Sequence, residues 1–290
     1  MRHVEFFNDP HFVNNYYRVK PSGTLSFFID FFWQTKFDHL WEQYPDNFSD
    51  MLFPNIGYSY LVNIGTPFTM EICDKKFTIK NDSFLPRHNS IECHHQPGNT
   101  IFGIKFRISP VVFEKKVNFS EYRQSMTPLS YLLDRNIVLL LKTNITFNER
   151  ITLLEEYFTG IIENNNTNKS VYLVSSIIDE TIKSGDFNSK IEDLAAQYNI
   201  SARTLQRYFE QYTSSGCKET FQILRARKIM ESFMHSKKVN LKEAGFYDYS
   251  HFYKYMRTFL GPDIMQEFIK KMKHIPYSTK QLKIVINRSS

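Results

Sequence analysis

Cysteine is scarce in this chain. Its 290 residues include three cysteines, and no two of them form a Cys-x-x-Cys pair. An odd and widely spaced set of this kind predicts neither a disulfide framework nor a thiolate zinc site, and it fits a reducing compartment. Long apolar runs are also missing, because no stretch approaches the roughly 18 apolar residues of a membrane span. The first residues lack the apolar core of a signal peptide. We therefore expect a cytoplasmic protein with no membrane partner.

Sequence motifs of catalysis are absent too. The chain has no Gly-rich phosphate loop, no nucleophile elbow and no His-Glu-x-x-His pattern. Potential metal ligands are densest at His88, Glu92, Cys93, His94 and His95. Adjacent residues of a strand point to opposite faces, so at most one of the two neighbouring histidines would join an inward site. A catalytic metal needs about three converging ligands. We predict no catalytic residue, no metal and no cofactor; the alternative of a cupin-like metal-dependent enzyme with an accessory helical domain stays open.

The first part of the chain has the pattern of a β protein. Short alternating apolar runs, such as residues 58–64 and 101–108, are separated by turn-forming residues. Several short strands at this spacing predict a small β-barrel or sandwich. Aromatic residues are dense at 27–33 and 41–60, where they form either plain core, as we expect, or the wall of an effector pocket. Helical spacing then puts the apolar residues of 149–162 on one face, which packs on its own barrel or on a second copy; self-packing is expected.

Charge divides the chain into two parts. Residues 171–290 hold 19 Lys and Arg against 12 Asp and Glu, whereas residues 1–170 are close to neutral. A basic excess confined to one part is typical of a surface that approaches phosphates. We predict an α+β protein with a β-barrel regulatory or dimerisation domain at 1–162, a polar linker at 163–170, a helical domain at 171–275 and a polar tail at 276–290.

The helical part carries two helix-turn-helix patterns. In the first, at 191–209, a helix and a turn lead to Ser201, a suitable N-cap for a second helix. The second helix points Ala202, Arg203, Gln206 and Arg207 outward, and Arg and Gln side chains match the major-groove edges of guanine and adenine. The second pattern, at 244–259, points Tyr249, Ser250, His251 and Lys254 outward and is expected to end at Gly261-Pro262. Whether this second unit reads bases or mainly contacts phosphate stays open.

A long basic helix is predicted between the two units, from about residue 217 to residue 234. It carries Arg225 and Lys228, which we assign to DNA contact. Eighteen residues span about 27 Å, and one turn of DNA is about 34 Å. Two recognition helices at this separation suit successive major-groove segments of one duplex.

Three sequence runs resemble the DNA-binding domain of the AraC/XylS family of bacterial transcription regulators. They are Ile-Ser-x-x-x-Leu-x-Arg-x-Phe at 200–209, Gly-Phe-x-Asp-x-Ser-His-Phe at 245–252 and Phe-Leu-Gly-Pro at 259–262. The resemblance covers about 100 residues and implies seven helices, with DNA contacts from the outward residues of both units. A weaker resemblance upstream, at Lys20-Pro-Ser-Gly-x-Leu25 and 102–106, implies a cupin-like barrel. We therefore predict a transcription regulator that binds double-stranded DNA; an effector and a homodimer stay open, and the sequence names neither.

Overall fold

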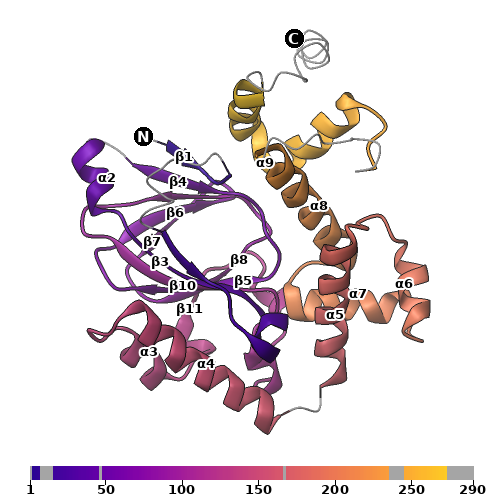
Figure 1. Cartoon of the computed structure of the whole chain (residues 1–290), viewed down its shortest axis with the longest axis horizontal. Coiled ribbons are helices and arrows are strands. Elements are labelled where there is room, and N and C mark those ends of the chain that lie inside the picture. The colour runs from indigo at the N-terminus through magenta and orange to yellow at the C-terminus, as the bar shows by residue number, and fades with distance from the viewer. Residues whose placement is uncertain (1, 7–15, 46–47, 166–167, 235–244, 273–290) are drawn as a thin grey trace.

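The computed structural model describes residues 2–6, 16–45, 48–165, 168–234 and 245–272 of the chain (Figure 1). Strands occupy the first part and helices the last, which confirms the predicted α+β class. The predicted polar tail lies outside the described residues. None of the helices in these ranges combines the length and the apolar character needed to cross a membrane.

The strands form two sheets. Sheet A has the strand order β1 (Arg2–Val4), β4 (Ser49–Leu52), β9 (Ile91–His94), β6 (Phe68–Ile72), β7 (Lys75–Ile79). Sheet B has the order β11 (Thr127–Pro128), β8 (Ser83–Pro86), β5 (Tyr58–Asn63), β10 (Thr100–Phe106), β3 (Ile29–Lys36), β2 (Tyr16–Val19). Only β1 and β4 pair in parallel within these sheets as described. In the described ranges the two sheets face each other without joining into one closed barrel.

The period of two along β5 explains why sheet B is buried on both faces. Tyr58, Tyr60 and Val62 belong to the apolar cluster that the helices cover, whereas Leu61 belongs to the cluster between the sheets. Successive side chains of a strand point to opposite faces, so β5 serves two cores at once. The pairing of β10 with β3 sets Gly103 opposite Trp33. A Cβ at Gly103 would lie 2.2 Å from the Trp33 ring, so only glycine leaves room for the indole there.

Helices cover the outer face of sheet B and continue to the end of the described chain (Figure 1). The helices of the first part are η1 (Gly23–Phe27), α2 (Asp38–Gln43), η2 (Pro110–Phe113), η3 (Phe119–Tyr122), η4 (Leu129–Tyr131), α3 (Arg135–Leu141) and α4 (Phe147–Asn164). Of these, α2 instead packs through Leu40 in the cluster between the two sheets. The helix α4 begins with a capping box between Thr146 and Glu149. Its apolar face is buried in the same cluster as sheet B, which confirms the predicted self-packing.

The last part contains α5 (Lys169–Ser184), α6 (Ile191–Gln197), α7 (Ala202–Thr213), α8 (Cys217–Met234) and α9 (Tyr249–Met272). One apolar cluster joins Val171 and Ile177 of α5 to sheet B, so the two-domain division remains a prediction. The expected helix end at Gly261-Pro262 is wrong, because α9 continues to Met272. A proline inside a helix removes one amide donor and clashes with the preceding turn, yet the residues on both sides of Pro262 are helical.

Candidate nucleic-acid interface and an interior cavity

The first helix-turn-helix unit is built by a tight turn between α6 and α7. Asn199 adopts a left-handed conformation with φ 54°, which asparagine tolerates better than most residues. The Ser201 hydroxyl then accepts a hydrogen bond from the Thr204 amide at 3.1 Å and caps α7, as the sequence predicts. Leu205 and Phe209 are fully buried on the inner side of α7. The turn and the cap therefore fix which side of α7 faces outward.

The outer side of α7 carries two exposed arginines. Arg203 and Arg207 are separated by four residues, so they lie on one face of the helix, and both are exposed. The Arg207 guanidinium lies 5.4 Å from the centre of the Tyr208 ring. Ala202 is half-buried at the start of the same helix. This face presents two guanidinium groups beside a small residue, a combination suited to guanine edges in a major groove.

Gln206 lies differently from its predicted neighbours. Its Nε2 donates to Glu210 Oε1 at 2.7 Å, and its Oε1 accepts from the Cys217 amide at 3.1 Å. The side chain thus supplies an acceptor to the first residue of α8 and ties α7 to α8. A helix leaves its first amides without internal partners, so this contact caps α8. A side chain engaged at both ends serves the junction of the two helices.

The two basic residues predicted on α8 differ in exposure. Arg225 is buried, donates to Asn188 Oδ1 at 3.2 Å and lies 3.8 Å from the centre of the Phe246 ring. Arg225 therefore links α8 to the residues directly before α9 on the buried side of the helices. Lys228 is exposed but borders a second cavity of about 310 Å³ together with Lys20 and Arg107 of the β region. Neither position belongs to the outer face that carries Arg203 and Arg207.

The second unit begins α9 with a reciprocal cap. The His251 amide donates to Asp248 Oδ1 at 2.8 Å, and His251 Nδ1 accepts from the Tyr247 amide at 3.4 Å. Ser250 is half-buried, and Lys254 is exposed one turn further along. The side chain of Tyr249 lies outside the described residues.

Tyr247 is a surface residue that the sequence analysis missed. It is 86% exposed directly before α9, next to the capped start of the helix. The only sequence signal was its place between Phe246, which is buried, and the cap at Asp248. An exposed aromatic side chain at a helix start adds a contact surface that the helical spacing of α9 does not reveal.

The potential metal ligands at residues 88–95 do not converge on one point in the described part of the chain. Burial lowers the pKa of His88 and of His95 to about 4. His95 stacks on Phe37 at 3.7 Å, and its Nδ1 is 2.7 Å from Asn99 Oδ1. In the described part of the chain, no three His, Cys, Asp or Glu residues are placed to hold one metal ion.

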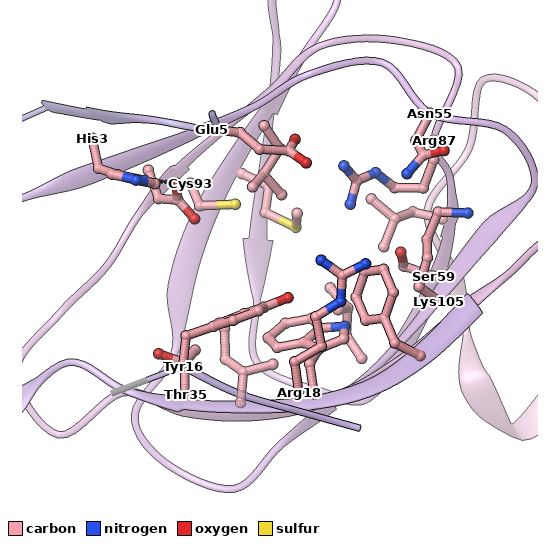
Figure 2. A pocket seen from close by; sticks show the side chains of 18 of the residues that line it. His3, Glu5, Tyr16, Arg18, Thr35, Asn55, Ser59, Arg87, Cys93 and Lys105 are labelled. Carbon is pink, nitrogen blue, oxygen red and sulfur yellow. Dashed lines mark hydrogen bonds and ion pairs between the residues drawn. The ribbon is translucent and has the colours of Figure 1, made fainter. Parts of the chain in front are cut away.

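A cavity of about 450 Å³ lies between the two sheets (Figure 2). One part of its wall is apolar and includes Trp33, Leu61, Phe68, Met70 and Ile101. The other part is charged and includes Glu5, Arg18, Arg87, Lys105 and Arg227. Arg227 belongs to α8, so the helical region closes a cavity that the sheets begin. The sequence could not show this cavity, because the cavity depends on the register of the sheets and on Arg227. Arg227 donates a hydrogen bond to Pro54, which lies 173 positions earlier in the chain.

The polar end of this cavity is lined by the basic residues Arg18, Arg87, Lys105 and Arg227 and by the acidic residues Glu5, Asp50 and Glu231. Arg18 lies 3.6 Å from the centre of the Phe31 ring and has no ion pair among the described residues. Burial lowers the pKa of Lys105 to about 7, although Asp30 lies 3.7 Å away and favours its charged form. Glu5 is the acid closest to Arg227, at 2.7 Å. Figure 2 shows the Glu5, Arg18 and Arg87 side chains directed toward the same space.

No protein-family model and no curated protein matches the chain. Solved structures that align with it include ToxT from Vibrio cholerae, with 11% identity, a TM-score of 0.41 and coverage of 84% of this chain and 93% of that one. An unsaturated fatty acid-bound ToxT from Vibrio cholerae has 11% identity, a TM-score of 0.39 and coverage of 84% and 90%. The AraC-like transcriptional activator CuxR has 11% identity, a TM-score of 0.27 and coverage of 82% and 93%. At such values, the function of this chain has to be sought in its own residues.

Proposed function

We propose that this chain is a transcription regulator of the AraC/XylS type that binds double-stranded DNA in a sequence-specific manner. The observation that carries the proposal is the capped helix α7, buried through Leu205 and Phe209 and exposed through Arg203 and Arg207. A helix held on one side and basic on the other fits the recognition helix of a helix-turn-helix unit. Together with the three family-like runs at 200–262, this geometry favours DNA over other polyanions.

The first unit is the main reading head in this proposal. Arg203 and Arg207 contact bases, and Ala202 allows the close approach of the helix start. Gln206 supports the α7–α8 junction, and Arg225 supports the second unit from inside. In the second unit, Ser250, His251 and Lys254 contact the neighbouring groove segment, joined by Tyr247. The helix α8, about 27 Å long for its 18 residues, sets the distance between the heads.

A second function is supported by the cavity between the sheets. We propose that it binds a small effector with an apolar body and an anionic group. The apolar wall suits the body of such a molecule, and the guanidinium groups of Arg18, Arg87 and Arg227 suit its charge. Since Arg227 of α8 forms part of the wall, occupation of the cavity would act directly on the helix that spaces the two heads. We assign no catalytic role to any residue of the cavity.

The DNA-binding proposal is tested by selecting bound sequences from a random duplex pool and then measuring affinities for the selected and for random DNA. Arg207→Ala is expected to weaken binding to selected DNA by about 5- to 150-fold, the range for one lost base contact, and to affect random DNA far less. The matched control Arg135→Ala removes an exposed arginine from α3 and should leave both affinities within about twofold. Equal losses on both DNAs for Arg207→Ala would remove its base-reading role.

A further inference from the structure

The carboxylate of Glu5 links the first strand to α8. Its Oε1 accepts from Arg227 Nη2 at 2.7 Å, and its Oε2 accepts from the Phe53 amide at 2.8 Å. Burial alone would raise the pKa of Glu5, but the charges of Arg227 and Arg87 and these hydrogen bonds lower it. Glu5 is therefore an ionised group inside a cavity wall that is otherwise rich in guanidinium groups.

Arg227 is held in place by more than Glu5. Its Nη1 donates to the Pro54 carbonyl oxygen at 3.1 Å, and its guanidinium carbon lies 4.8 Å from the centre of the Phe6 ring. These contacts fix the guanidinium plane independently of the carboxylate. Another anion that entered the cavity would therefore meet a guanidinium already oriented to receive it, and less side-chain freedom would be lost on binding.

Glu5 directly follows the first strand, and its amide donates to the Met51 carbonyl oxygen at 2.8 Å, while His3 of the strand pairs with Asp50 at 2.7 Å. β1 is three residues long and lies at the edge of sheet A, paired in parallel with β4 alone. Arg2 pairs with Glu92 at 3.0 Å, and Val4 packs in a cluster with residues of α8 and α9. The strand thus contacts both the sheet and the helices, and Glu5 supplies its charged contact with α8.

We propose that Glu5 is a built-in competitor for the anionic effector: the anion replaces the Glu5 carboxylate on Arg227 and breaks the charged contact between the end of the first strand and α8. This inference rests on the effector cavity proposed above and adds the step that couples its occupation to α8. In the free protein, Glu5 neutralises part of the guanidinium charge and keeps β1, Phe53 and α8 together. With the anion bound, Arg227 keeps its place while β1 and the Phe53 amide lose their common partner.

The test uses the full-length chain and anilinonaphthalene sulfonate, an apolar aromatic anion whose fluorescence rises in apolar surroundings. Energy transfer from tryptophan reports binding at this site, because Trp33 lines the cavity and Trp41, the other tryptophan, packs against the same cluster between the sheets. Glu5→Gln removes the competing charge and is expected to bind the probe about fivefold or more tightly than the wild type. Glu92→Gln is the matched control, because Glu92 of β9 pairs with Arg2 of β1 and does not line the cavity, and it should stay within about twofold of the wild type. Arg227→Gln should weaken binding by about fivefold or more.

Hydrogen exchange gives a second measurement that needs no variant. Saturating probe should speed exchange of the Phe53 amide in the wild type by about tenfold or more, because Glu5 no longer accepts its hydrogen bond. Unchanged Phe53 exchange at saturation, equal affinities of wild type and Glu5→Gln, or no binding of the probe by either chain would each overturn the inference. Both measurements omit DNA. A negative result therefore does not affect the DNA-binding proposal, and a negative DNA-selection result does not affect the interpretation of these two measurements.

Discussion

The histidine at position 95 shows how burial at one residue sets a pH dependence for the whole fold. His95 is 3% exposed and stacks against Phe37, with Phe48 and Phe68 rings at 5.5 Å. Burial lowers its pKa to about 4, from an ordinary value near 6.5. Between these values the unfolded chain binds a proton that the folded chain does not. The stability that His95 contributes is therefore complete above pH 6.5 and is lost as the pH falls toward 4.

We expect the wild type to lose about 2 kcal/mol more unfolding free energy than His95→Gln between pH 7 and pH 5, since each pH unit within this window corresponds to about 1.4 kcal/mol. Urea unfolding at the two pH values measures both differences. Burial lowers the pKa of His88 to about 4 as well. The double variant His88→Gln/His95→Gln should therefore lose even less unfolding free energy between pH 7 and pH 5 than His95→Gln does. Parallel losses in the wild type and in both variants would show that the folded protein protonates these rings as readily as the unfolded chain does.

At the scale of elements, Gln206 ties two helices together. We expect Gln206→Ala to lower the unfolding free energy by about 1–2 kcal/mol, because the Cys217 amide at the buried start of α8 loses its acceptor. DNA affinity should fall equally for selected and random sequences, because the loss of the α7–α8 contact disturbs the distance between the two helical units and removes no base contact. Arg203→Ala, an exposed neighbour, should change stability by less than about 0.5 kcal/mol. If the Gln206→Ala protein has wild-type stability and loses affinity for selected DNA only, Gln206 contacts bases, as the sequence predicts.

The same elements show how far the sequence could be used for prediction. Apolar spacing and the Ser201 cap predicted α6, α7 and α8, because these depend on residues within a few positions of each other. The role of Gln206 could not be predicted, since its partner lies 11 residues away across a left-handed Ser214. The cavity could not be predicted either, because the residues of its wall are far apart in the sequence. Its wall joins β1, sheet B and α8, and only the fold brings Glu5 beside Arg227.

At the scale of the molecule, the helical region completes its apolar packing with the β region. Val4, Met51 and Phe53 of sheet A and its flank share one cluster with residues of α8 and α9, the second unit included. A second cluster joins sheet B to α5, α6, α7 and α8. An ion pair between the β region and α8 accompanies each cluster: Arg123 pairs with Glu219, and Glu5 pairs with Arg227. Each of the two helical units is therefore supported by the β region through its own set of contacts.

Shared cores of this kind predict that the β and helical regions unfold together. The two tryptophans, Trp33 and Trp41, both lie in the β region, whereas far-ultraviolet circular dichroism is dominated by the helices. In urea the two signals should give coincident transitions in the wild type. Phe53→Ala removes a buried ring from the cluster beneath the second unit, at a cost of about 3–5 kcal/mol. The helices of the second unit should then unfold at lower urea than the tryptophan transition, because their cluster has lost the Phe53 ring, whereas the cluster around α5 and α7 still holds the first unit. Two separate transitions in the wild type would mean that the heads are held independently of the β region, and a cavity ligand would then have no rigid path to them.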